Sequence, residues 1–232
     1  MHTQTLPPSP LAPWRWRDVL WGLLLGLGLC LLLLLLRPQV LQAWQALLAW
    51  WFDALGISGT ARDTPPPSAG MLQVTGTAVL GLYALAGLWH ERYRPLRVVV
   101  RALCLVQASA CVFFALAPAQ FPWAVDQHLA SMLQMNADFL SLVPLMLALG
   151  WGVLNLPWRL KLLGPLAVAA YFGVWLPHQV VLHAWVLHHA SVLFMPLLLL
   201  CLGPLLNGWI FVSLYAWLAS LTPRTGAAGA GA

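Results

Sequence analysis

The chain has 232 residues, of which 61% are hydrophobic and only 7% are charged. This composition excludes an ordinary soluble domain and predicts an integral membrane protein with roughly five to seven spanning helices. The formal net charge of +5 falls in short loops, where the retention of basic residues on the cytoplasmic side accounts for it. Nucleic-acid binding is therefore not expected, because no basic face with interleaved aromatic residues is present.

The apolar runs predict an all-α polytopic bundle of about six spanning helices. The expected spans cover residues 18–36, 71–89, 98–117, 138–156, 162–176 and 192–220. A cytoplasmic N-terminal segment, 1–17, precedes the single membrane domain 18–221, and a low-complexity cytoplasmic tail, 222–232, follows it. The first span is expected to remain uncleaved, since Arg37 and Pro38 stand where a small-residue cleavage site would be needed.

The basic residues fix the orientation of these spans. Nine of the eleven fall on one side of the membrane when the chain is threaded through it: Arg15, Arg17, Arg92, Arg94, Arg97, Arg101, Arg159, Lys161 and Arg224. Arg37 and Arg62 fall on the other side. Loops rich in Lys and Arg stay in the cytoplasm, so both termini are predicted to be cytoplasmic.

Two or three further helices are expected to lie flat on the outer face. In residues 38–55 the apolar positions recur with helical period, Pro38 suits a first helical turn and Gly56 suits a helix stop. Amphipathic patterns also predict interfacial helices over 122–136 and 177–190. From Gln179 to Leu221 nothing is charged, and both six and seven spans are compatible with this stretch; six leaves more chain for the turns.

Small residues mark one packing face in the first span. Gly22 and Gly26 are four residues apart, a spacing that lets a second helix approach closely.

The most basic loop of the chain follows the second expected span, and anionic lipid headgroups are its expected neighbours. The residues assigned to that contact are Arg92, Arg94, Arg97 and Arg101.

Five of the seven histidines fall on the outer side, together with Asp126. They are His128, His178, His183, His188 and His189. Imidazole and carboxylate groups are ligands of metals and haem and carriers of protons. The spacing excludes chelation by one helix, which needs histidines three or four residues apart. A site would therefore need His128 or an Asp from another segment; otherwise these histidines are interface residues.

Three functions remain open on this sequence. The first is a subunit or assembly factor of a larger complex in a bacterial inner membrane, with outer loops in the periplasm and with lipids and other membrane subunits as partners. It rests on the 14 tryptophans, the glycine pair and the lack of nucleotide-binding or hydrolase motifs. The second is an outer-face enzyme that binds haem, copper, zinc or a tetrapyrrole pigment through these histidines. The third is a lipid-handling protein.

Overall fold

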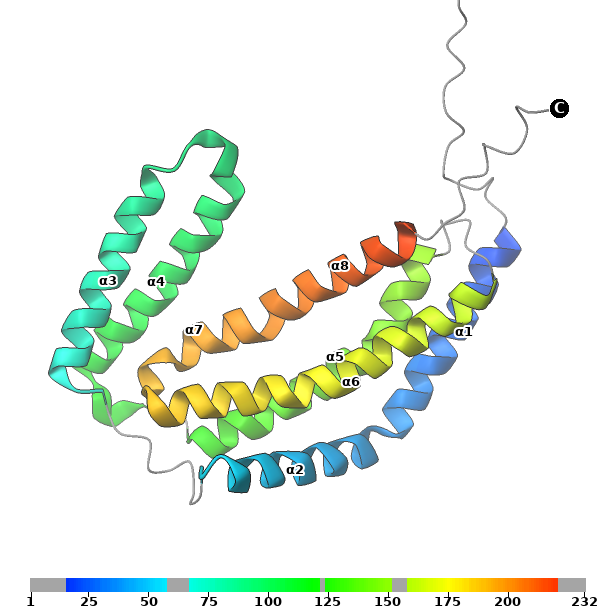
Figure 1. Cartoon of the computed structure of the whole chain (residues 1–232), viewed down its shortest axis with the longest axis horizontal. Helices are drawn as coiled ribbons and strands as arrows, with labels where there is room; N and C mark the ends of the chain where they lie inside the picture. Colours follow the sequence, from blue (N-terminus) through cyan, green and yellow to red (C-terminus); the bar gives the residue numbers. More distant parts are fainter. Residues whose placement is uncertain (1–15, 58–66, 122–123, 152–157, 221–232) are drawn as a thin grey trace, which may run out of the picture. The chain divides into compact units, whose positions relative to one another are not determined.

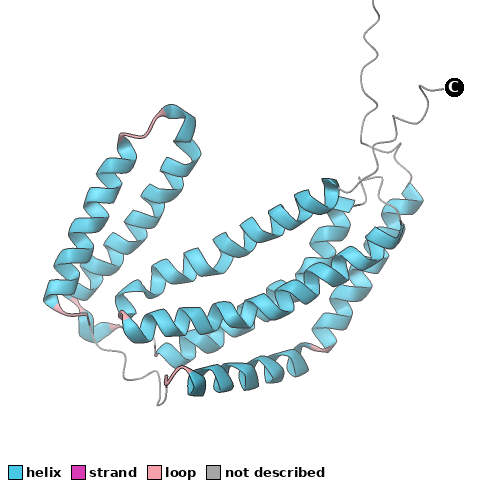
Figure 2. Ribbon diagram, in the orientation of Figure 1, coloured by secondary structure: helices cyan, strands magenta, loops and turns pink. Residues whose placement is uncertain are grey.

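The computed structural model describes residues 16–57, 67–121, 124–151 and 158–220, and in that part of the chain all regular structure is helical (Figure 2). The α-helices are α1 (Trp16–Leu35), α2 (Arg37–Ala54), α3 (Ala69–Gly87), α4 (Arg94–Leu116), α5 (Val125–Trp151), α6 (Trp158–His189), α7 (Met195–Leu200) and α8 (Leu206–Ser220). The all-α prediction is confirmed. The tail 222–232, most of segment 1–17 and residues Arg62 and Arg224 lie outside the described residues.

The helices are long and apolar enough for an integral membrane protein. Among the residues that the structure describes, five stretches are long and apolar enough to span a membrane: Ala69–Gly87, Glu91–Leu116, Val125–Gly150, Arg159–His189 and Val192–Ser220. A sixth is the pair α1 and α2, which is bent by 58° between Leu35 and Arg37. The expected membrane character is thus confirmed at the level of helix length and composition.

Helix α2 begins and ends within one residue of the range that its periodicity predicts. Its buried face carries Trp44 and Leu48, while Gln42 and Gln45 are exposed. Gly56, just after the helix, has φ of +65°, a left-handed conformation that glycine adopts without steric cost. Glycine is therefore what allows the chain to leave the helix at this point.

Helix α5 corrects one expectation. A flat helix over 122–136 followed by a separate span over 138–156 was expected, but the structure has one continuous helix, Val125–Trp151. Nothing between Asn136 and Asp138 breaks a helix, and the Asp138 carboxylate is paired with Arg37 at 2.8 Å. The charged residue Asp138 is therefore accommodated within the helix.

Helix α6 corrects a second expectation. The predicted span 162–176 and flat helix 177–190 are one helix, Trp158–His189, with Pro177 in its interior. Proline has no N–H, so it cannot bond the carbonyl four residues earlier, at Gly173. The indole Nε1–H of Trp44 donates to that Gly173 carbonyl instead, at 2.9 Å. This bond removes part of the penalty that favoured a break.

The last predicted span, 192–220, is not a single regular helix. It begins with a 3-10 turn, Val192–Phe194, continues as α7, passes a π-helical turn, Cys201–Leu205, and ends as α8. Gly203 has non-helical dihedral angles (φ −96°, ψ −114°) and is followed by Pro204. Glycine and proline together account for this kink.

The chain divides into two compact units. Unit 1 comprises 1–45, 134–177 and 208–232, and its described core is formed by α1, α8 and parts of α2, α5 and α6 (Figure 1). Phe139 of α5 and Phe172 of α6 make an edge-to-face contact with ring centroids 5.2 Å apart. In the same unit, Asn136 donates from Nδ2 to the Leu176 carbonyl at 3.3 Å. Both contacts join antiparallel helices.

Unit 2 comprises 46–133 and 178–207. Helices α3 and α4 lie side by side as a hairpin (Figure 1), closed by the short 3-10 turn Glu91–Tyr93. Helix α4 also packs against α7 and the turn before it. There the buried Gln107 amide donates from Nε2 to the Leu193 carbonyl at 3.1 Å. A polar side chain in an apolar helix is thereby used to join two segments.

Candidate functional site

The first turn of α5 and the last two turns of α6 bring two histidines together within unit 2. His128 of α5 is 7% exposed and His183 of α6 is fully buried. Their Nε2 atoms are 3.1 Å apart, with ring centroids 5.0 Å apart and the rings tilted by 41°. The two imidazole edges therefore face each other directly.

The helical repeat places both histidine rings on the buried faces of α5 and α6. On α5 the neighbours of His128 on the buried face are Leu129 and Met132, and on α6 the buried residues Val180 and Leu187 flank His183. Asp126 lies in the first turn of α5, where a carboxylate is favoured by the helix dipole, and it is exposed. The two histidines are thus buried with the apolar faces of the two helices, whereas Asp126 is exposed to the surroundings of the chain.

A second polar pair lies one helical turn from His183. Gln179 is fully buried and donates from Nε2 to Asn207 Oδ1 at 3.2 Å. Two atoms on this face of α6, Gln179 Oε1 and His183 Nδ1, are buried without a hydrogen-bond partner among the described residues. A buried polar atom without a partner costs free energy. The residues His128, His183, Gln179 and Asn207 therefore form a buried polar cluster with two unpartnered atoms.

The other three histidines that were expected on the outer side do not join the cluster. His178 packs edge-on against Trp51, with ring centroids 5.9 Å apart. His188 and His189 are exposed at the end of α6, and the His189 ring stacks near Trp185 and forms a 2.9 Å hydrogen bond through Nδ1 with its carbonyl. Of the six residues proposed for a metal or cofactor, the structure brings His128 and His183 together from two helices. The adjacent His188 and His189 rings also touch edge to face, with centroids 5.1 Å apart.

The geometry limits which groups the pair could hold. Among the residues that the structure describes, no three His, Cys, Asp or Glu converge as metal ligands. Axial ligation of one haem iron from both sides would place two imidazole nitrogens about 4 Å apart, whereas these are 3.1 Å apart. The arrangement as it stands fits a hydrogen bond between the rings or two adjacent bonds to one ion, not a bis-histidine haem.

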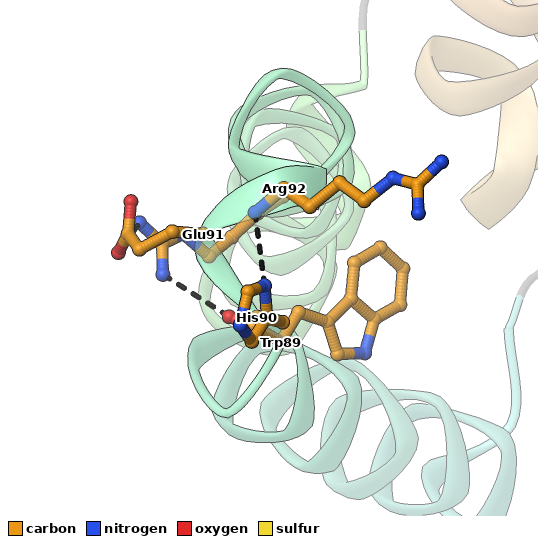
Figure 3. A network of polar contacts seen from close by, with 5 residues as sticks. Trp89, His90, Glu91 and Arg92 are labelled. Carbon is orange, nitrogen blue, oxygen red and sulfur yellow. Dashed lines mark hydrogen bonds and ion pairs between the residues drawn. The ribbon is translucent and has the colours of Figure 1, made fainter.

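The basic loop forms a separate polar network in unit 2 (Figure 3). The His90 ring accepts at Nδ1 from the Arg92 backbone N–H at 3.2 Å and caps the short turn. Arg97 pairs with Glu91 at 3.1 Å, and the Arg101 guanidinium carbon lies 4.8 Å from the Tyr83 ring centroid. Two of the four arginines assigned to lipid headgroups are thus engaged within the chain, while Arg92 and Arg94 are exposed.

The two glycines of α1 differ in their surroundings. Gly26 is buried against α5, so that an added Cβ would overlap Ala148 and lie 3.1 Å from the Pro144 carbonyl oxygen. Gly22 has nothing within 4 Å of the corresponding position. In unit 1, only Gly26 of this pair therefore brings two backbones together.

Sequence reasoning missed the buried amides Asn136, Gln179 and Asn207. The signal for one of them was present, because Gln179 and His183 are four residues apart and so share a helix face. Comparison with protein-family models, curated proteins and solved structures finds no match to this chain.

Proposed function

We propose that this protein is a subunit or accessory factor of a larger complex in a bacterial inner membrane. The observation that carries the proposal is the outward face of α3. Only 6% of this candidate span is buried within the chain, although it contains residues that suit contact with another helix. Gly70 and Gly81 are exposed with nothing within 4 Å of an added Cβ, and Gln73 and Thr77 lie exposed between them.

The expected occupant of this face is a transmembrane helix of another polypeptide. Gly70, Thr77 and Gly81 fall on one side of α3 at 100° per residue, and small residues so placed let a helix backbone approach closely. Lipid tails offer no hydrogen bond to an exposed amide such as that of Gln73, whereas a neighbouring helix with a polar side chain does. The polarity of the face therefore favours protein over lipid as the partner.

The proposed topology has six spans with both termini in the cytoplasm. Helix α1 has 20 residues and is about 30 Å long, which suffices for one crossing on its own. With α2 at the outer interface, crossings by α1, α3, α4, α5, α6 and the α7–α8 segment keep the basic loops together. The described residues on that side are Arg17, Arg92, Arg94, Arg97, Arg101, Arg159 and Lys161. The opposite side is then the periplasm.

A bulky substitution on α3 tests the proposed contact. Gly81→Leu should release the partner and lower the native mass of the complex after gentle extraction from its own membrane. The matched control is Leu82→Phe, which adds bulk to a 46% exposed residue about 100° away from Gly81 around α3. Loss of the partner in Gly81→Leu but not in Leu82→Phe supports the proposal; an unchanged complex in both variants, or equal loss in both, contradicts it.

A second candidate function, an outer-face metal protein, is favoured by the His128–His183 pair. Its chemistry is independent of any partner on α3, so the two candidates can be tested separately.

A further inference from the structure

We propose that His128 and His183 together bind one divalent transition-metal ion of the Zn²⁺ or Cu²⁺ class through their Nε2 atoms. The remaining coordination positions are taken by water in the isolated protein. This metal site goes beyond the proposed subunit role and does not depend on it.

The separation of the two nitrogens suits two bonds to one ion. A metal lies about 2.0–2.1 Å from an imidazole nitrogen. Two nitrogens 3.1 Å apart then subtend an angle of roughly 100° at the metal, between the octahedral and tetrahedral values. The two rings approach each other from different helices, α5 and α6, with centroids 5.0 Å apart. The second helix supplies the second ligand that no single helix here provides.

The unpartnered atoms around His183 fit the metal-bound state. When a metal takes Nε2, the proton of a neutral imidazole resides on Nδ1, which becomes a hydrogen-bond donor. His183 Nδ1 is buried without a partner, and so is Gln179 Oε1, an acceptor one turn away on the same face. Donor and acceptor are then complementary in kind. Groups that orient a metal-binding histidine in this way raise metal affinity.

The site is incomplete within the described chain and sits near helix ends. No third His, Cys, Asp or Glu converges on the pair among the described residues, which leaves positions open to water. His128 and His183 each lie within about 10 Å of the end of their helix, so that an ion reaches them without crossing the full membrane. Because His183 is fully buried and His128 is 7% exposed, the ion enters only when the ends of α5 and α6 part. An ion held by two protein ligands should still exchange more readily than one in a closed four-ligand structural site.

The test uses the full chain in detergent, purified without a polyhistidine tag, stripped with chelator and titrated with Zn²⁺ or Cu²⁺ alone. The exposed pair His188 and His189 is a source of adventitious binding, so the reference protein is the double variant His188→Ala, His189→Ala. We expect the reference to bind one metal per chain. His128→Ala and His183→Ala, each made in that reference, should bind at least about tenfold more weakly, and Gln179→Ala about tenfold more weakly.

Electron paramagnetic resonance of the Cu²⁺-loaded reference keeps the proposal testable if an alanine variant fails to fold. Hyperfine coupling to two imidazole nitrogens is expected, falling to one in His128→Gln. The proposed site is overturned if the double variant has lost all stoichiometric binding, or if binding in the reference is unaffected by folded variants at both His128 and His183. Coupling that does not change in His128→Gln would also overturn it.

Discussion

The indole Nε1–H of Trp44 donates a hydrogen bond to the carbonyl of Gly173 at 2.9 Å, and Gly173 is the residue whose carbonyl Pro177 leaves without its helical partner. A carbonyl freed in this way inside an apolar helix has no water to bond, so its only compensation is another protein donor. Trp44 supplies that donor from 129 residues away in sequence. Helix α6 can therefore continue through Pro177.

The Trp44–Gly173 bond predicts a coupling between two substitutions. Trp44→Phe removes the donor and should lower the free energy of unfolding by about 1–3 kcal/mol, because the Gly173 carbonyl is then unpaired. In a Pro177→Ala background the loss should be smaller, since the substituted alanine has a backbone N–H for the same carbonyl. A double-mutant cycle measured by denaturant unfolding checks this. The control is Trp50→Phe, at a position that is 59% exposed.

The absence of coupling between positions 44 and 177 would contradict this explanation of α6. So would an equal effect of Trp44→Phe and Trp50→Phe, because a loss of aromatic surface alone would then account for the change.

The two glycines of α1 predict different effects of the same substitution. Gly26→Ala should destabilise the protein by about 1–3 kcal/mol, because its methyl group overlaps Ala148 and approaches the Pro144 carbonyl. Gly22→Ala should be neutral or stabilising by up to about 1 kcal/mol, since alanine favours the helix and nothing lies within 4 Å. Thermal unfolding of the two variants in the same detergent makes the comparison. Equal effects would mean that α1 does not pack on α5 at Gly26.

The buried amide of Gln107 predicts a local loss of stability in unit 2. Gln107→Leu keeps the volume but leaves the Leu193 carbonyl without its 3.1 Å donor, so the variant should lose about 1–2 kcal/mol. Ser109→Ala is the control, because Ser109 is exposed and bonds only the Val106 carbonyl of its own helix. Amide hydrogen exchange around Leu193 should increase in Gln107→Leu and stay unchanged in Ser109→Ala. The opposite pattern would contradict the assigned contact.

The ion pair of Arg37 and Asp138 predicts a small, rescuable effect. Their side chains are 34% and 57% exposed, and partly exposed pairs contribute about 0.2–1 kcal/mol. Asp138→Arg alone should destabilise the protein by placing two like charges together, and adding Arg37→Asp should restore most of the loss. A charge-swapped double variant no more stable than Asp138→Arg would show that the two side chains do not interact.

The sequence predicted a helix well where the residues that start, continue and end it lie close together in the chain. The helix over 38–55 was predictable because apolar period, Pro38 and Gly56 agree, and α2 occupies this range within one residue. The continuity of α6 through Pro177 was not predictable, because local rules end or kink a helix at proline and the compensating donor, Trp44, lies far away in sequence. The continuity of α5 at residue 137 was predictable locally, since no residue between Asn136 and Asp138 breaks a helix; the amphipathic pattern over 122–136 was wrongly interpreted as a separate helix.

The sequence indicated that a site would consist of histidines from more than one segment, but not which histidines would meet. Spacing on α6 excluded chelation by that helix alone and required a residue from elsewhere, with His128 among the possibilities. Which of four histidines on α6 would meet it depends on how α5 and α6 pack against each other, which spacing alone does not encode. The amide pair of Gln179 and Asn207 was missed because each residue, taken singly, resembles an isolated polar residue in an apolar run.

The most direct test of the proposed subunit role is the protein mass of the native particle, measured by mass photometry or native mass spectrometry after gentle extraction from its own membrane. A subunit of a larger complex should give a particle that exceeds the 25.4 kDa chain and contains at least one other polypeptide. A particle of 25.4 kDa, or only whole multiples of it, would contradict the proposed role.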